Sequence, residues 1–359
     1  MKKTQSRFLQ AAVLALVAIL PSSSAIAHEC HEVLYAAVSG DGTVIKVDLR
    51  TLQYNPILDN LNIPYGVVAD NHGSVFVPDT GNNVIKRIYP NVTPIIVWSN
   101  LSYPSGLAVG RDGNMLLANY GSGCFLELDG MTRSTIACGF EGAVSVRRYW
   151  NPNAWDGGTQ PRSLQYVGIW RGGSPGGVVL FSQNADGTWT NRQTVATSLS
   201  YPYDAASDRA GNLFVSELGL GRIIEFPAAP GGLVSTNPVV FAKGLSPMGL
   251  VFDGTGNLYE ADYGGGRINK FTLTNGVLNS MPLAVLTNLN LPTYLAFAPP
   301  PVVDIHRAGS SVVLDWPDAT FALQTAPVLT GTFTNVPGAT SPYTNPISGA
   351  TGFFRLESR

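Results

Sequence analysis

The sequence predicts an all-β fold built from repeated four-stranded units, and three observations support this prediction. A phrase of short apolar strands separated by Gly, Asn and Asp turns recurs along most of the chain. Glycine and proline are abundant, at 39 and 25 of 359 residues, which is typical of many tight turns. Charged residues make up only 13% of the chain, against a usual ~25%. Long helices with solvated, charged faces are therefore not expected.

The repeats give the architecture. Each clear copy begins at a proline, and the five starting positions are Pro64, Pro104, Pro202, Pro247 and Pro292. The intervals of 40, 98, 45 and 45 residues imply that the longest one holds two units, the hidden one starting near Glu141. One such unit cannot bury its own faces, whereas units of this length stacked around an axis form a β-propeller.

The two ends of the repeat region complement each other. The last copy, Pro292–Phe297, is an inner strand with nothing after it, whereas Leu34–Val47 holds two strands that lack a first one. Pairing between these segments would leave no open sheet edge. We therefore expect residues 28–298 to form a six-bladed β-propeller closed by its own termini.

Three motifs carry a family resemblance. Residues 64–70 read Pro-Tyr-Gly-Val-Val-Ala-Asp, residues 79–85 read Asp-Thr-Gly-Asn-Asn-Val-Ile, and residues 211–215 read Gly-Asn-Leu-Phe-Val. These motifs resemble NHL repeats, which are related in shape to regucalcin/gluconolactonase and virginiamycin B lyase-like propellers. The resemblance implies a fold that enzymes and adaptors share.

The N-terminal 27 residues have the order of a signal peptide. Lys2, Lys3 and Arg7 precede an uncharged run that ends in Ala25-Ile26-Ala27. Cleavage would leave 22 less three, or 19, basic residues against 24 acidic ones, so nucleic acid is not an expected partner. We expect a secreted or periplasmic monomer with no transmembrane segment after cleavage.

A second domain is predicted after the repeats. Residues 299–303 begin with three prolines and form a stiff linker. Residues 304–359 alternate apolar and polar positions and resemble a fibronectin type III-like module of secreted bacterial proteins, a small β-sandwich. The resemblance implies attachment or spacing.

A ligand site is predicted where the inner strands begin, since propeller sites usually lie at that end of the channel. Aromatic rings with a few polar groups there suit a sugar, a peptide or another small amphipathic ligand, and a protein surface is the other candidate partner. The candidate residues are Tyr65, Glu141, Trp170, Arg171, Tyr203, Asp204 and Tyr294.

A metal site is the alternative interpretation of the same residues. The regucalcin and gluconolactonase group holds a divalent cation such as Ca²⁺ on Glu, Asn and Asp side chains before strand glycines. Glu141 falls on that pattern, Asp204 lies one residue away from it, and no Asn matches. Virginiamycin B lyase-like enzymes use a histidine at this end, and no histidine here can lie there.

Three further features have structural interpretations. Cys124 and Cys138 flank a turn and are a candidate disulfide in an exported protein. Residues 147–162 read as an insertion between two strands. Four polar residues recur before Gly-rich turns and are predicted to cap those turns: Asp79, Asn119, Glu217 and Asp262.

The preferred functional interpretation is a non-enzymatic binding scaffold that presents a small-molecule, glycan or protein site, with the C-terminal module for attachment or spacing. The alternative is a metal-assisted lactonase, hydrolase or lyase with Glu141 and Asp204 as metal ligands or base. The sequence contains no nucleophile elbow, zinc pair or phosphate loop that would indicate another chemistry.

Overall fold

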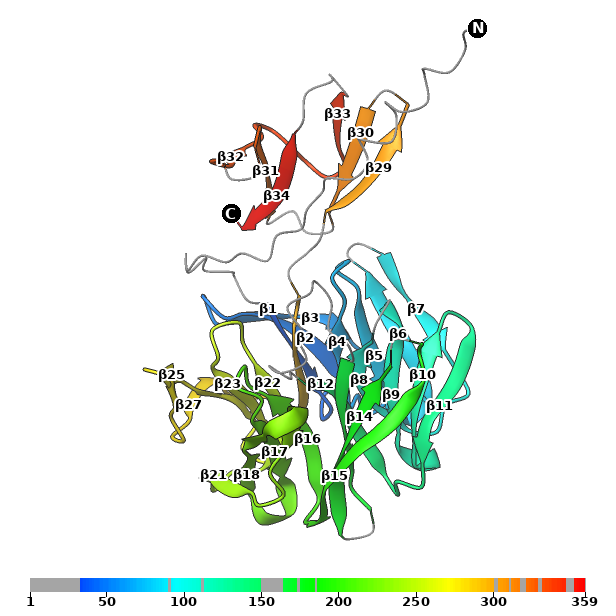
Figure 1. Ribbon diagram of the computed structural model, residues 1–359, viewed down its shortest axis with the longest axis vertical. Coiled ribbons are helices and arrows are strands. Elements are labelled where there is room, and N and C mark those ends of the chain that lie inside the picture. The colour runs from blue at the N-terminus through cyan, green and yellow to red at the C-terminus, as the bar shows by residue number, and fades with distance from the viewer. Residues whose placement is uncertain are drawn as a thin grey trace, which may run out of the picture. The chain divides into compact units, whose positions relative to one another are not determined.

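The computed structural model describes residues 33–89, 92–110, 113–149, 164–172, 175–184, 186–299, 303–309, 311–316, 321–328, 331–346 and 352–358. It confirms the all-β class: within these ranges the only helices are short 3-10 turns. None of the helices in the described residues is long and apolar enough to cross a membrane. The chain divides into two compact units, and the division falls between Pro299 and Pro300 (Figure 1).

The unit Glu32–Pro299 contains six four-stranded antiparallel sheets among its described residues. Three sheets consist of β28 (Pro292–Phe297) with β1 (Val33–Val38), β2 (Thr43–Asp48) and β3 (Gln53–Leu58); of β4 (Val68–Ala69), β5 (Val75–Asp79), β6 (Val84–Tyr89) and β7 (Val92–Trp98); and of β8 (Pro104–Val109), β9 (Met115–Asn119), β10 (Cys124–Asp129) and β11 (Thr132–Cys138). The other three consist of β12 (Ala143–Tyr149), β13 (Leu164–Trp170), β14 (Gly176–Gln183) and β15 (Trp189–Leu199); of β16 (Pro202–Ser207), β17 (Leu213–Glu217), β18 (Arg222–Phe226) and β21 (Val239–Lys243); and of β22 (Pro247–Phe252), β23 (Leu258–Asp262), β24 (Arg267–Phe271) and β27 (Leu283–Leu286).

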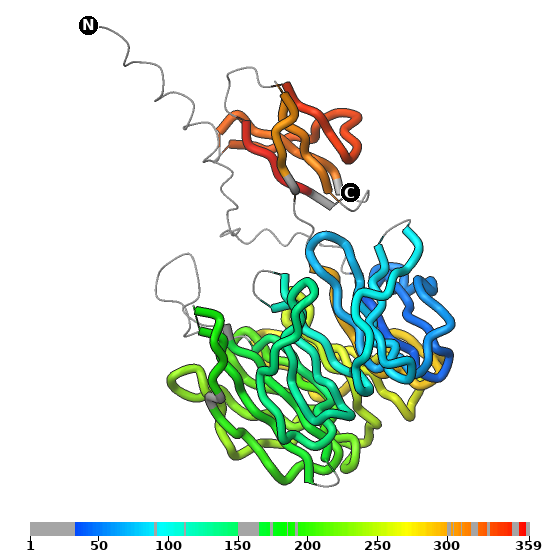
Figure 2. The backbone as a smooth tube through the Cα atoms, turned by 90° about the vertical axis from the view of Figure 1, so that its right-hand side faces the viewer, coloured from blue at the N-terminus to red at the C-terminus, as the bar shows by residue number. Residues whose placement is uncertain are grey.

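The first strands of successive sheets contact one another in the order β4, β8, β12, β16, β22, β28 and back to β4. In the sheet that joins both ends of the unit, β28 pairs with β1, with Leu34 opposite Phe297. Figure 2 shows the sheets following in chain order from blue through green to yellow. Apolar side chains such as Leu117, Ile169 and Phe271 fill the space between sheets and are fully buried.

A recurring turn explains the Gly-Asn pairs of the repeat. The Oδ1 atom of Asp208 accepts hydrogen bonds from the backbone N–H groups of Ala210 and Asn212, and Asp253 does the same two and four residues on. The intervening glycines, Gly211 and Gly256, have φ of 89° and 95°, which glycine adopts readily. This turn joins the first strand of each of these sheets to its second.

The four recurring polar residues tie loops to strands. All four are buried, and each accepts a hydrogen bond from a backbone N–H 16 or 17 residues earlier, in the loop that enters the same sheet. The turn-capping prediction is correct in part: besides the loop N–H, Asp262 accepts a hydrogen bond from the N–H of Gly265 in its own turn. The feature that all four share is the hydrogen bond to the entering loop, 16 or 17 residues earlier: Asp79, Asn119, Glu217 and Asp262.

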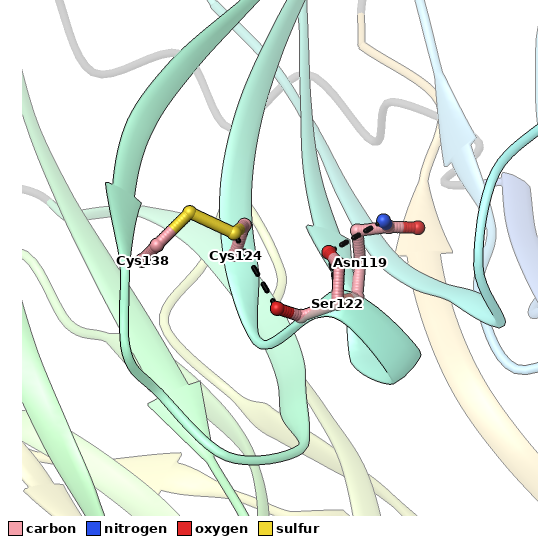
Figure 3. Close-up of a disulfide and its surroundings, with 4 residues drawn as sticks. All are labelled: Asn119, Ser122, Cys124 and Cys138. Atoms are coloured by element: carbon pink, nitrogen blue, oxygen red, sulfur yellow. Dashed lines mark hydrogen bonds between the residues drawn. A yellow bond between two sulfur atoms is a disulfide. The ribbon is translucent and has the colours of Figure 1, made fainter.

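Asn119 is the one amide among these four residues, and it lies next to a disulfide. Asp79, Glu217 and Asp262 each form an ion pair with a basic residue of the third strand, whereas Asn119 lies opposite Cys124. Cys124 and Cys138 are paired across β10 and β11 and joined by a disulfide, with Cα atoms 4.1 Å apart (Figure 3). In the sheet of Asn119, the third-strand residue opposite the amide thus forms a covalent bond to the fourth strand and no ion pair with the second.

The second unit also consists of strands. β30 (Ser311–Asp315) pairs with β29 (Asp304–Ala308) and β33 (Tyr343–Pro346), and β31 (Phe321–Ala326) pairs with β32 (Thr334–Asn335) and β34 (Phe353–Ser358). The buried residues Leu314, Trp316 and Leu323 come from both three-stranded sheets and share one core. Two short hairpins of the first unit were not predicted: β19 (Ala228–Ala229) with β20 (Leu233–Val234), and β25 (Leu273–Thr274) with β26 (Val277–Leu278).

Candidate functional site

The residue two positions after the repeat-starting proline faces the neighbouring first strands at close range. A Cβ atom added to Gly106 would lie 2.5 Å from the hydroxyl oxygen of Tyr294, and one added to Gly249 would lie 2.8 Å from the Tyr294 Cα atom. The strand register puts Asp204 and Tyr294 at this glycine position, as the repeat alignment predicted. The glycines leave the room that the larger side chains occupy.

Arg147 and Asp204 form a buried ion pair in that space. The Arg147 Nε and Nη2 atoms donate to the two carboxylate oxygens of Asp204 at 2.9 and 2.6 Å. The Ser145 hydroxyl donates to Oδ1 at 2.6 Å, and the Leu250 N–H donates to Oδ2 at 3.0 Å. Asp204 is fully buried, so these partners take the place of the water that would otherwise solvate its carboxylate.

Tyr294 completes this buried group. Its ring lies under the Arg147 guanidinium, 4.6 Å from ring centroid to Cζ, and its hydroxyl donates to the Val144 carbonyl at 3.2 Å. Arg147 also donates to the Leu295 carbonyl at 3.1 Å. Burial raises the pKa of the Tyr294 hydroxyl well above its ordinary value, so it stays protonated. The group therefore ties β12, β16, β22 and β28 together.

This arrangement corrects two predictions about the ligand site. Tyr294 was expected at the end of the channel, but its side chain is fully buried and bonded to protein groups. Asp204 was a candidate ligand for a metal or a small molecule, but both of its oxygens accept hydrogen bonds from Arg147, Ser145 and Leu250. Neither side chain has the exposed polar atoms that a site residue needs.

Sequence reasoning missed Arg147 because it assigned residues 147–162 to an insertion. Arg147 lies instead within β12, and Arg148 and Tyr149 continue that strand. The remaining residues of the proposed insertion lie outside the described ranges. The apolar alternation of Val144 and Val146 breaks at Arg148, so no local pattern indicated that the strand continued.

Glu141 was placed three residues out of register. Ala143 pairs with Trp170 as Pro104 pairs with Asn119, so the glycine position of this sheet is Ser145 and the residue before it is Val144. Glu141 lies in the turn before β12, where its side chain is exposed and its carbonyl accepts from the Gly172 N–H at 2.7 Å. The error arose because Gly142 resembles a strand glycine, although its φ of 67° belongs to a turn.

A separate group of side chains lies where the first strands begin and the second strands end. Arg171 follows β13, and its guanidinium donates to the hydroxyls of Tyr203 and, at 2.9 Å, Tyr120. The same guanidinium lies 4.9 and 5.0 Å from the ring centroids of Tyr203 and Tyr120. It is half-buried, and no described carboxylate forms an ion pair with it.

Two further tyrosines complete this group, which we call the tyrosine–arginine cluster: Tyr65, Tyr120, Arg171, Tyr203 and Tyr263. The Tyr65 ring lies edge-on to the Tyr203 ring at 6.4 Å, and Tyr263 packs against the same apolar core as Tyr65 and Tyr120. Burial raises the pKa of the Tyr65 and Tyr203 hydroxyls, and the nearby Tyr263 raises both further. The hydroxyls of Tyr65 and Tyr203 therefore remain neutral hydrogen-bond donors and acceptors at physiological pH.

The structure thus brings together Tyr65, Arg171 and Tyr203 of the predicted ligand site. Trp170 points away from the cluster: its ring packs on Phe140 at 5.2 Å and covers Gly177. Tyr120 was missed, although its position gave a signal. It follows the second strand of its sheet directly, as Arg171 and Tyr263 do in theirs.

Metal-ligating side chains do not gather at the cluster. Across the described part of the chain, no three His, Cys, Asp or Glu residues are grouped so that they could hold a metal ion. The cluster offers instead one guanidinium charge, several phenolic hydroxyls and aromatic ring faces. Groups of this kind can bind an anion that carries hydroxyls or an apolar ring.

Comparisons with known proteins bear on the fold. No family model matches the chain, and no curated protein is similar enough to be matched. A gluconolactonase from Xanthomonas campestris has a similar structure, with a TM-score of 0.51 and 12% identity, over 83% of this chain and 96% of that one. A catalytically inactive virginiamycin B lyase from Staphylococcus aureus, determined with quinupristin, has a TM-score of 0.50 and 12% identity, over 80% of this chain and 92% of that one.

A protein of unknown function from Bacteroides caccae is similar to the same degree, with a TM-score of 0.50 and 13% identity, over 74% of this chain and 98% of that one. At these identities the similarity concerns the fold and not the activity. The chain has an all-β, propeller-like fold of the kind found in gluconolactonase-like proteins.

Proposed function

We propose that this protein is a secreted, six-bladed NHL-type propeller that binds a small anionic ligand at the tyrosine–arginine cluster. The observation that carries the proposal is the set of hydrogen-bond partners around the Arg171 guanidinium. Among the described residues, the half-buried Arg171 guanidinium is bonded to tyrosine hydroxyls and to no carboxylate, so its positive charge is unbalanced in surroundings where a carboxylate would be bound more strongly than in water.

The arrangement of the sheets supports the propeller part of this proposal. Each of the six four-stranded sheets acts as one blade, and the first strands contact one another in a closed order. The pairing of β28 with β1 joins the two ends of the repeat region in a single sheet. The Arg147–Asp204 pair and Tyr294 fill the space between the first strands, so the ligand approaches from the end where the cluster lies.

The side chains around Arg171 favour a ligand with hydroxyl groups, such as a sugar acid. Every aromatic residue of the cluster is a tyrosine, whereas phenylalanines such as Phe125, Phe181 and Phe271 fill the interior between sheets. Phenolic hydroxyls cost desolvation energy when buried and are useful where a polar partner is bound. Gluconate and glucuronate are suitable first probes.

Isothermal titration calorimetry with gluconate, glucuronate and uncharged glucose tests the proposal. We expect the two acids to bind and glucose to bind at least about tenfold more weakly, since a charged hydrogen bond contributes about 1.5–3 kcal/mol. Arg171→Gln should abolish the difference between acid and glucose. Arg50→Gln is the control, because Arg50 lies in the exposed turn between β2 and β3. Equal binding of acid by wild type and Arg171→Gln would refute the proposal.

A metal-assisted lactonase, hydrolase or lyase is the second candidate, because gluconolactonase and lyase structures are similar to this one. Glu141 is the exposed carboxylate that this candidate would use. Stoichiometric binding of Ca²⁺ that is lost in Glu141→Gln, together with hydrolysis of gluconolactone, would favour the enzyme. A thermal-shift screen of divalent ions without effect would favour the binding protein.

The C-terminal unit has a separate role in this proposal. Its two three-stranded sheets around one core are consistent with a small β-sandwich of the fibronectin type III-like kind. We assign it to attachment or spacing. A chain truncated after Pro299 should then bind the sugar acid as the full chain does, while its distribution between cell envelope and medium changes.

A further inference from the structure

In most sheets, the residue immediately before the repeat-starting proline, or before Ala143 in the β12 sheet, has an unusual backbone conformation. Its φ lies in the left-handed region, between 48° and 67°, in five of the six described sheets. The five residues are Ile63, Tyr103, Gly142, Tyr201 and Leu291. The backbone carbonyls of Tyr103, Gly142 and Tyr201 accept N–H bonds from Tyr120, Arg171 and Leu218, the residues that follow the second strands.

Tyrosine is a costly choice at these positions. A non-glycine residue in the left-handed region is strained, whereas glycine adopts it freely, as Gly142 does. The strain is not offset by burial, because the side chains of Tyr103 and Tyr201 are 54% and 46% exposed. Strained backbone with an exposed aromatic side chain is a reason to consider a functional role.

Both tyrosines flank Arg171. Tyr103 is bonded through its carbonyl to Tyr120, whose hydroxyl accepts from Arg171. Tyr201 lies two residues before Tyr203, whose hydroxyl also accepts from Arg171. Between them, the equivalent residue of the Arg171 sheet is Gly142, which has no side chain. The exposed rings of Tyr103 and Tyr201 therefore lie on the two sheets adjacent to the guanidinium.

We infer that the ligand is an acidic oligosaccharide rather than a single sugar acid. Its uronate carboxylate binds Arg171, and the sugar rings that follow it stack on the exposed faces of Tyr103 and Tyr201. A tyrosine ring suits a sugar because it offers an apolar face to the sugar C–H groups and a hydroxyl at its edge. This inference rests on the proposed function, because it uses the same arginine as the anchor.

The test compares how tightly uronic acid monomers and trimers bind at Arg171. Calorimetry is performed on the full chain with galacturonic and mannuronic acids and with the trimer of each. At least one of the two trimers should bind at least about tenfold more tightly than its monomer. Tyr103→Gly and Tyr201→Gly should each weaken that trimer by about fivefold to tenfold and leave monomer binding unchanged, which is the size expected for one aromatic contact.

Glycine is chosen as the replacement because it should change stability and ligand affinity in different directions. The substitution relieves the left-handed strain, so the thermal midpoint should stay unchanged or rise while the affinity falls. Ile63→Gly is the matched control: Ile63 has φ of 55°, is 45% exposed, and lies two sheets from Arg171. It should not change trimer affinity.

The outcomes separate the two proposals. If monomers bind through Arg171 but trimers bind no more tightly, or if the tyrosine variants bind trimers normally, the oligosaccharide inference is wrong and the anion site stands. If neither monomer nor trimer binds in an Arg171-dependent way, both proposals are wrong. Tighter binding of acetylated triglutamate than of either trimer would replace the sugar with an acidic peptide and overturn the inference.

Discussion

Arg147 and Asp204, which are 57 residues apart in the chain, form a two-pronged ion pair between the first strands of neighbouring sheets. The pair is buried, and its further hydrogen bonds reach β22 and β28. One contact between two side chains thus connects four of the six sheets, which makes it the most informative position at which to test the fold.

Removing one member of this pair should destabilise the protein strongly. Arg147→Met keeps a long side chain but leaves the Asp204 carboxylate buried without its counter-charge, and we expect a loss of about 3–5 kcal/mol in the free energy of unfolding. The double variant Arg147→Met/Asp204→Leu should recover most of that loss. Urea denaturation measures both values. A single variant within about 1 kcal/mol of wild type would contradict the role assigned to the pair.

The disulfide should stabilise the sheet β8–β11. Cys124→Ser/Cys138→Ser opens a loop with a sequence separation of 14 residues, and loop-closure entropy predicts a loss of about 3 kcal/mol. Wild type unfolded in the presence of dithiothreitol should lose the same amount. If dithiothreitol lowers the stability of the serine variant equally, the effect does not come from this bond.

The loop tether at Glu217 gives a third test. Its Oε1 atom accepts from the Ser200 N–H at 2.8 Å, and its Oε2 atom accepts from Arg222 at 2.5 Å. Glu217→Ala leaves the half-buried Ser200 N–H without this acceptor, so we expect a loss of about 2 kcal/mol. Glu217→Gln retains an acceptor and should lose less. Amide hydrogen exchange at residue 200 should accelerate in Glu217→Ala and remain slow in Glu217→Gln.

Glu260 should make stability depend on pH. It is buried, its Oε2 atom accepts from the Asn269 amide at 2.7 Å, and burial raises its pKa from 4.5 to about 8. The folded state therefore holds a proton that the unfolded state releases. This stabilisation is complete below about pH 4.5 and is lost as pH rises through about 8, with a slope of up to about 1.4 kcal/mol per pH unit.

Comparison with Glu260→Gln isolates this effect. The amide cannot ionise, so the stability of the variant relative to wild type should rise between pH 5 and pH 9. Unfolding curves measured at each pH provide the difference. Parallel pH profiles for the two proteins would show that Glu260 is not the group responsible.

Much of the first unit could be predicted from local sequence patterns. Prolines 104, 202, 247 and 292 start the repeats and also begin β8, β16, β22 and β28. Alternating apolar residues and turn residues act over short distances, so their meaning does not depend on the rest of the fold. The alignment also placed Asp204 and Tyr294 correctly at the glycine position. It failed at Glu141, where the one irregular repeat offered Gly142 as a false match.

The sequence by itself determined the class of fold, the repeat boundaries and the residues that recur with structural roles. Only the tertiary structure decided which polar residues are available to a ligand: it buried Asp204 against Arg147, turned Trp170 into the interior, and placed Tyr120 beside Arg171. The reason is physical. Strand periodicity is encoded locally, whereas the partner of a charged or aromatic side chain is set by strands from other sheets, tens of residues away.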